Sequence, residues 1–112
     1  MIEVRQISTK SNDFKNIKRV YNTVFPQNEL LPLSLLKMRA KAGKAEFCSI
    51  YNEEGKWVGF FYTVYNKRIA YIFFLAIDPH HHGQGLGSAT LTAIKERYAG
   101  KQITLSAERP DP

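Results

Sequence analysis

The feature that most constrains the fold is a run of nine residues, Ile69–Ile77, in which every side chain is apolar or aromatic. The run is about half as long as a helix that crosses a membrane, and β-branched and aromatic residues favour strands. Alternate residues of a strand point to opposite faces of the sheet. Strict alternation places Ile69, Tyr71, Phe73, Leu75 and Ile77 on one face and Ala70, Ile72, Phe74 and Ala76 on the other. The sequence therefore predicts an interior strand that is covered on both faces.

Two similar runs, Glu46–Tyr51 and Lys56–Tyr65, precede this strand, which we expect over Arg68–Ile77. Polar turn signals separate the three runs, at Asn52–Gly55 and at Asn66–Lys67. Strands joined by such short turns pair antiparallel. We therefore expect a three-stranded meander.

Helical periodicity precedes the meander. A first helix has its apolar face at Phe14, Ile17, Tyr21 and Val24. Ser11 or Asn12 can cap this helix, and Pro26 ends it. A shorter helix is expected from about Leu33 to Gly43, since Pro32 suits its first turn and glycine commonly terminates helices.

A third helix is expected over Leu86–Tyr98, and strands are expected at Ile2–Ile7 and Gln102–Ala107. The predicted order is β-α-α-β-β-β-α-β. We expect a single mixed α/β domain over residues 1–112, with a mostly antiparallel sheet and helices on both faces.

Composition indicates an ordinary folded domain. Of 112 residues, 44% are hydrophobic and 23% are charged, which is typical of globular proteins and argues against a disordered tail. The net charge of +6 lies in residues 1–44, because residues 45–112 carry seven charges of each sign. A basic surface attracts nucleic acids, anionic lipids and phosphorylated cofactors alike, so the charge alone does not select a partner.

The cysteine content and the N-terminal residues indicate the cellular compartment of the protein. The single cysteine, Cys48, cannot form an intrachain disulfide, and the first residues lack the apolar core of a secretory signal. We therefore expect a cytoplasmic protein without a membrane segment. Cys48 lies in a predicted strand with no nearby base, which favours an inert core thiol over a nucleophile.

The loop between the apolar strand and the third helix carries the strongest functional signal. Gly83, Gly85 and Gly87 alternate there, and Ser88 follows. Glycine adopts positive φ and lets a ligand approach the backbone. A helix N-terminus presents unpaired amides and the positive end of its dipole. The loop therefore predicts a phosphate or pyrophosphate site, with an ordinary tight turn as the alternative.

The glycine loop matches neither of the two common nucleotide-binding loops. A Walker A loop has a lysine directly before the Ser or Thr that opens the helix, but in this sequence the residue before Ser88 is Gly87. A dinucleotide-binding loop counted from Gly83 has Ser88 in place of its last glycine, and this loop follows a meander rather than opening a βαβ unit.

The sequence Leu75-Ala76-Ile77-Asp78-Pro79, followed by His82-Gly83-Gln84-Gly85-Leu86-Gly87-Ser88, resembles the acyl-CoA signature of the GNAT N-acetyltransferase superfamily. That signature is Arg/Gln-x-x-Gly-x-Gly/Ala between the fourth strand and the third helix, and the predicted element order is also similar. The resemblance implies a GNAT-like acyl-CoA N-acyltransferase fold with acetyl-CoA (coenzyme A) as co-substrate and no metal.

The resemblance also implies roles for single residues. The amides of Gly83, Gln84, Gly85, Leu86 and Gly87 would bind the CoA pyrophosphate. The backbone of Ala76 and Ile77 would pair with the pantetheine arm as an added strand. His82 occupies the position that usually holds Arg or Gln.

Two further expectations concern the C-terminal end. The family normally continues past its fifth strand with a helix and two strands, which often supply a tyrosine that protonates the leaving thiolate, so the chain resembles a C-terminally truncated member. Family members commonly use a carboxylate to deprotonate the acceptor, and Glu108 is the candidate general base here. A solvated loop acid beside Arg109 is the alternative for Glu108.

Other candidates favour structural roles. His80, His81 and His82 are consecutive and cannot all reach one ion, and no further ligands stand at zinc-like spacing, so no metal site is predicted. The aromatic residues of the strands are expected to form the core, rather than a base-stacking surface, although those near strand ends can line an acceptor pocket.

Together these observations predict an N-acetyltransferase that transfers acetyl from acetyl-CoA to a primary amine of a small molecule or peptide. A non-catalytic module that binds acyl-CoA or a partner is the main alternative, and a basic nucleic-acid-binding domain is the third. An unpaired C-terminal sheet edge would favour a homodimer.

Overall fold

The structure is a computed structural model that describes residues 2–7, 13–24, 33–43 and 45–105. Its elements are β1 (Glu3–Gln6), α1 (Asp13–Val24), α2 (Leu33–Lys41), β2 (Ala45–Tyr51), β3 (Trp57–Tyr65), β4 (Ile69–Ile77), the 3-10 helix η2 (Pro79–His81), α3 (Leu86–Arg97) and β5 (Gln102–Leu105). This order confirms the predicted one and adds η2. Ser11, Asn12 and the predicted strand residues after Leu105 lie outside the described residues.

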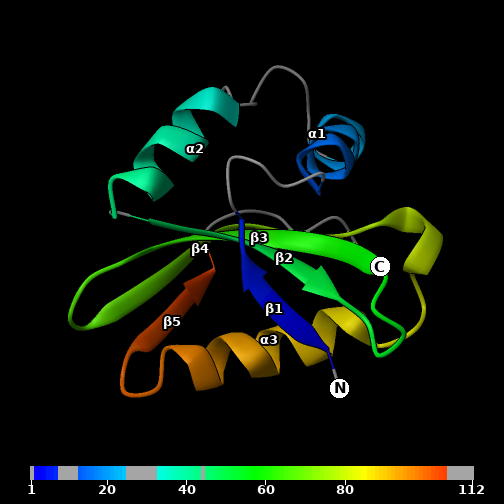
Figure 1. The fold of residues 1–112 in the computed structure, drawn as a ribbon. Helices are drawn as coiled ribbons and strands as arrows, with labels where there is room; N and C mark the ends of the chain where they lie inside the picture. Colours follow the sequence, from blue (N-terminus) through cyan, green and yellow to red (C-terminus); the bar gives the residue numbers. More distant parts are fainter. Residues whose placement is uncertain (1, 8–12, 25–32, 44, 106–112) are drawn as a thin grey trace.

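One five-stranded sheet forms the centre of the domain, in the order β1-β2-β3-β4-β5. All neighbouring pairs are antiparallel except β4 and β5, which run parallel. β4 lies between β3 and β5, so the prediction of an interior strand is confirmed. Helices α1 and α2 cover one face of the sheet and α3 covers the other (Figure 1).

The layer formed by α1 and α2 is built on the predicted periodicity. Ile17 and Tyr21 of α1 and Leu36 of α2 are at most 2% exposed and pack with aromatic residues of β2 and β3. The ring of Phe14 contacts Phe47 edge-on, with 6.3 Å between their centroids. The side chain of Val24 is outside the described residues.

The opposite core lies between the sheet and α3. Ile94 and Tyr98 are buried there with Cys48, Ile72 and Leu75. The placement of Cys48 agrees with the expectation of an inert core thiol, since burial raises its pKa to about 12.

The predicted strict alternation along β4 is wrong. Tyr62 and Thr63 of β3 are adjacent, but their partners on β4 are Phe74 and Ile72, so Phe73 forms a β-bulge. A bulge adds one residue to one strand and changes the phase of the side chains that follow. As a result Ile72 and Leu75 share the α3 core, although the alternation placed them on opposite faces.

The two interior strands separate beyond the bulge. β5 pairs with β4 only over Ile69–Ile72, and within the described residues no strand lies beside Phe73–Ile77 on that side. Within the described residues, this side of β4 faces no neighbouring strand from Leu75 to Ile77, and this edge leads toward the glycine loop.

Candidate functional site

The free edge of β4 presents backbone groups of particular residues. Asp78 donates its amide to the carbonyl of Val58 at 2.7 Å, so its backbone groups face β3. Backbone groups of successive strand residues point to alternate sides. The N–H and C=O groups of Ile77 and Leu75 therefore face the open side, whereas those of Ala76 face β3.

This orientation bears on the prediction for Ala76 and Ile77. The Ile77 amide faces the open side and can bond an extended ligand, whereas its carbonyl oxygen already contacts His82. Leu75, which the sequence reasoning missed, is better placed than Ala76 to offer both groups. The sequence alone shows that backbone groups of alternate strand residues face opposite edges. Which of Leu75 and Ala76 faces the open edge can be decided only from the register of β4 with β3.

A glycine on the neighbouring strand lets β4 lie close. A Cβ atom added at Gly59 would stand 2.3 Å from the Ala76 carbonyl oxygen and 3.1 Å from the Ile77 Cα. Real Cβ atoms do not approach backbone atoms so closely, so only glycine fits at this position. A glycine inside a strand pattern signals close approach of another backbone, and the sequence analysis did not use that signal.

Asp78 organises the turn after β4. Its side chain is buried and caps η2 by accepting the His80 amide at 3.1 Å. Arg19 of α1 donates to the other carboxylate oxygen at 2.8 Å. Burial raises the pKa of Asp78, but these two hydrogen bonds outweigh burial and hold it below its usual value. The carboxylate therefore ties α1 to the start of the glycine loop.

The glycine loop opens α3 with left-handed backbone. Gly83 has φ of 80° and Gly85, the N-cap of α3, has φ of 71°. A Cβ atom at either glycine would meet nothing within 4 Å, so both face open space. The first helical hydrogen bond runs from the Ala89 amide to the Gly85 carbonyl. The amides of the first turn before Ala89 have no helical carbonyl to bond.

The loop and the free edge enclose one cavity of about 360 Å³. It is lined by Leu75, Ala76, Ile77, His81, His82, Gly83, Gly85, Leu86, Gly87 and Ser88. Eight of the nine predicted cofactor-binding residues therefore surround one space. The exception is Gln84, which lies instead beside a separate hollow next to the β2–β3 turn.

His82 is oriented differently from a residue that faces a phosphate. Its Nε2 atom lies 3.0 Å from the Ile77 carbonyl oxygen. Since a carbonyl only accepts, the Nε2 atom carries the proton in this contact. The imidazole therefore contacts the end of the free edge of β4 and closes the loop back onto it.

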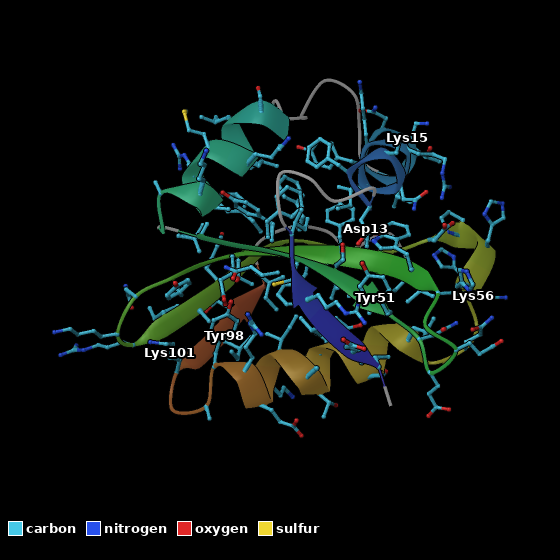
Figure 2. The ribbon with its side chains drawn as sticks, in the orientation of Figure 1. Asp13, Lys15, Tyr51, Lys56, Tyr98 and Lys101 are labelled. Atoms are coloured by element: carbon cyan, nitrogen blue, oxygen red, sulfur yellow. The ribbon has the colours of Figure 1, made fainter. Side chains whose placement is uncertain are left out.

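A second polar cluster lies on the α3 side of the sheet, away from the cavity (Figure 2). The hydroxyl of Tyr98 bonds Thr63 and the carboxylate of Glu46, and Arg97 pairs with Glu46 at 2.7 Å. Burial and the Glu46 hydrogen bond raise the pKa of Tyr98. Because every member of this cluster has a partner, it holds α3 to β2 and β3 rather than forming a reactive site.

No group of three or more His, Cys, Asp or Glu side chains is arranged to hold a metal ion in the part of the chain that the structure describes. No helix in that same part is long and apolar enough to span a membrane. Glu108 lies outside the described residues, so its predicted role stays a prediction.

Comparison with known proteins identifies the family. Residues 12–110 match the family model described as the Acetyltransferase (GNAT) family. The chain belongs to this family. The GNAT resemblance and the mixed α/β fold expected from the sequence are thereby confirmed. No curated protein sequence matches the chain significantly.

Solved structures share the fold at low sequence identity. A GNAT-family protein from Bacteroides thetaiotaomicron superposes with a TM-score of 0.83 at 22% identity, over 98% of this chain and 62% of that one. An aminoglycoside acetyltransferase from an uncultured soil metagenomic sample, in complex with sisomicin, superposes with a TM-score of 0.72 at 22% identity, over 96% of this chain and 78% of that one. The ribosomal-protein-S18-alanine N-acetyltransferase of Escherichia coli superposes with a TM-score of 0.67 at 18% identity, over 88% of this chain and 59% of that one. The chain thus spans about three-fifths of the length of the first and third of these GNAT proteins.

Proposed function

We propose that the chain transfers the acetyl group of acetyl-CoA to a primary amine. The observation that carries the proposal is the open edge at the end of β4, which leads through Asp78 and the short 3-10 helix η2 into a glycine loop at the N-terminus of α3. An extended arm with amide groups can add to such an edge as a strand would, and the helix N-terminus suits a pyrophosphate. Membership of the GNAT family supports the same reading.

The residues of the cavity fit CoA. Gly83 and Gly85 face open space in left-handed conformations, so the amides from Gly83 to Gly87 can approach a pyrophosphate without side chains in the way. Ser88 adds a hydroxyl donor at the cavity wall. Ile77, with Leu75, would pair with the pantetheine arm.

The reaction we propose is direct attack. The acceptor nitrogen forms a bond to the thioester carbonyl carbon, the carbon–sulfur bond breaks, and the thiolate leaves and takes up a proton. Backbone amides near the bulge of β4 would polarise the carbonyl. A primary amine has a pKa near 10 and must first lose a proton, and Glu108 is the proposed base. Where turnover exceeds background, Glu108→Gln should lower kcat and remove the acidic limb of its pH profile.

Binding of CoA is tested by thermal shift. CoA and 3′-dephospho-CoA should raise the melting temperature by similar amounts, because the site holds the pyrophosphate. Gly85→Asp places a carboxylate where that anion would lie and should abolish the shift. Gly43→Asp is the matched control, since Gly43 also has a positive φ (81°) and open space around it but lies after α2. Equal CoA shifts in the two variants would remove the central claim.

A non-catalytic module is the second candidate. The observation in its favour is that the described residues line a cavity suited to CoA, whereas the proposed base, Glu108, is not among them. Turnover of acetyl-CoA with polyamines and short peptides separates the two functions. We expect residues 1–112 alone to bind CoA with turnover near background, and robust acetylation by this chain would establish the enzyme without a further segment.

The free edge of β5 supports a further proposal, that the chain self-associates. Among the described residues, β5 pairs with β4 and with no other strand. Open edges pair readily with a second copy, which predicts a two-fold dimer. Light scattering over a concentration series should show a mass above 12.8 kDa, and a monomer at every concentration would contradict the proposal.

A further inference from the structure

Tyr62 of β3 carries an unexplained polar atom. The residue is 1% exposed, and within the described chain its hydroxyl is the one buried side-chain polar atom without a hydrogen-bond partner. Leaving a buried donor unpaired is unfavourable, and phenylalanine would fill the same space without that cost. Such an atom in a native fold calls for a reason other than packing.

The position of Tyr62 along the sheet supplies that reason. Its register partner on β4 is Phe74, next to the bulge at Phe73. This is the level at which β4 separates from β5, directly after Ile72. A strand rises about 3.3 Å per residue, so Phe74 lies roughly 10 Å along β4 from Ile77. An arm that follows the open edge from the glycine loop would bring its reactive end to the level of Tyr62, with β4 between the arm and β3.

Aromatic rings pack around Tyr62. The Tyr62 ring packs edge-on against Phe47 and Phe74, with centroids 5.2 and 6.5 Å away. Phe74 is only half-buried and stacks on Phe73 at 5.8 Å. Burial raises the pKa of Tyr62, whereas the charge of Arg39 on α2 lowers it. The hydroxyl therefore lies beneath a partly exposed aromatic wall and within the field of a guanidinium.

The helix layer above this wall is strongly cationic. Helices α1 and α2 carry six cations and one anion, namely Lys15, Lys18, Arg19, Lys37, Arg39, Lys41 and Asp13. The anion Asp13 accepts a hydrogen bond from Tyr51 (Figure 2). Among the described residues, Arg19 is the one cation of this layer in an ion pair. The described part of this layer therefore carries an excess of positive charge.

We propose that Tyr62 and Arg39 bind an anionic group, a carboxylate or a phosphate, on the acceptor amine. The inference rests on the proposed acetyl transfer and adds its acceptor class. The Tyr62 O–H donates to an oxygen of the anion and Arg39 supplies the opposite charge, which together hold the amine at the level of the bulge. The same layer repels polycationic acceptors.

The test compares acceptors that differ in one charge. Phenylalanine is paired with phenylalaninamide for the carboxylate, and glucosamine 6-phosphate with glucosamine for the phosphate. Sisomicin serves as the polycation. Affinity is measured by calorimetry with CoA present, and acetyl-CoA turnover is measured where it exceeds background. We expect the acidic member of at least one pair to bind about tenfold more tightly than its neutral partner, and sisomicin not to bind.

Two variants test whether Tyr62 and Arg39 cause the preference for the acidic acceptor. Tyr62→Phe should leave the melting temperature unchanged or raise it and leave CoA affinity unchanged, yet reduce the preference for the acidic member about tenfold. Arg39→Gln should reduce the same preference, whereas Lys41→Gln, on the same helix, should change it less than twofold. A purely structural role of the hydroxyl would not alter the ratio between acidic and neutral acceptors.

Failure of this inference can be distinguished from failure of the proposed function. A chain that binds CoA but shows no preference within either pair, or keeps its preference in Tyr62→Phe, overturns this inference and leaves the proposed function standing. Absence of the CoA thermal shift in the wild-type chain contradicts the proposed function itself.

Discussion

Replacing Gly59 by alanine tests the close approach of β3 to the end of β4. The added Cβ atom would lie 2.3 Å from the Ala76 carbonyl oxygen and 3.1 Å from the Ile77 Cα and Cδ1 atoms. An ordinary contact is about 3.5 Å, so backbone must move by about 1 Å. No flexible side chain can absorb that movement, because the nearest atom belongs to the main chain.

The expected cost follows from that displacement. Overpacking in a core costs about 1–3 kcal/mol, and a main-chain clash belongs near the top of this range. In a domain of this size, 2–3 kcal/mol corresponds to a fall of about 10 °C in the melting temperature. Since the movement pushes on Ala76 and Ile77, CoA affinity should fall as well.

Thermal denaturation and CoA titration of Gly59→Ala measure both effects. Gly87→Ala is the stability control, because a Cβ atom at that helical position meets nothing within 4 Å and alanine favours helix. It should keep or raise the melting temperature. If Gly59→Ala melted within 2–3 °C of the wild type (about 0.5 kcal/mol), the tight contact between β3 and β4 would be refuted.

Three other predictions concern buried polar groups. Asp78→Asn should destabilise the fold at pH 7 by about 1–3 kcal/mol. Because the folded pKa of Asp78 is lowered, the wild-type advantage is fully present above its unfolded pKa and should decline as pH falls from about 4 through the lower folded pKa; equal differences at pH 7 and pH 3 in denaturant melts would contradict this. Tyr98→Phe leaves Thr63 and Glu46 without one hydrogen-bond partner and should cost about 1–3 kcal/mol, measured by urea unfolding, whereas the exposed Tyr65→Phe should cost little. Cys48, with a pKa of about 12, should resist a thiol-specific disulfide reagent at pH 8 until the chain unfolds, and rapid labelling of the native protein would show that the thiol is accessible.

Much of the fold was predictable because its signals are local. Ile17 and Tyr21 of the apolar face predicted for α1 are buried, and α3 begins at the predicted residue and ends one residue before the predicted end. The bounds predicted for β4 agree with the strand Ile69–Ile77 to within one residue. The glycine loop could be placed from the sequence because it stands between an apolar strand and an amphipathic helix, and the structure has it between β4 and α3. Eight of the nine residues assigned to the cofactor from the sequence line a single cavity.

The errors and omissions arise where one strand depends on another. The bulge at Phe73 exists only in the pairing of β4 with β3, so alternation read from one strand misassigned its faces. The choice between Leu75 and Ala76 for the free edge depends on the same register. The contact of His82 with the Ile77 carbonyl brings together residues on either side of η2, and no local pattern specifies it.

The sequence by itself determined the order of the elements, the interior strand and the glycine loop, because hydrophobic period and glycine chemistry act within a few residues. Only the tertiary structure decided where β4 leaves β5, which backbone groups stay unpaired, and that the buried Tyr62 hydroxyl lies at that level without a partner. The physical reason is that register, bulges and the satisfaction of buried polar atoms are properties of pairs of segments brought together by folding.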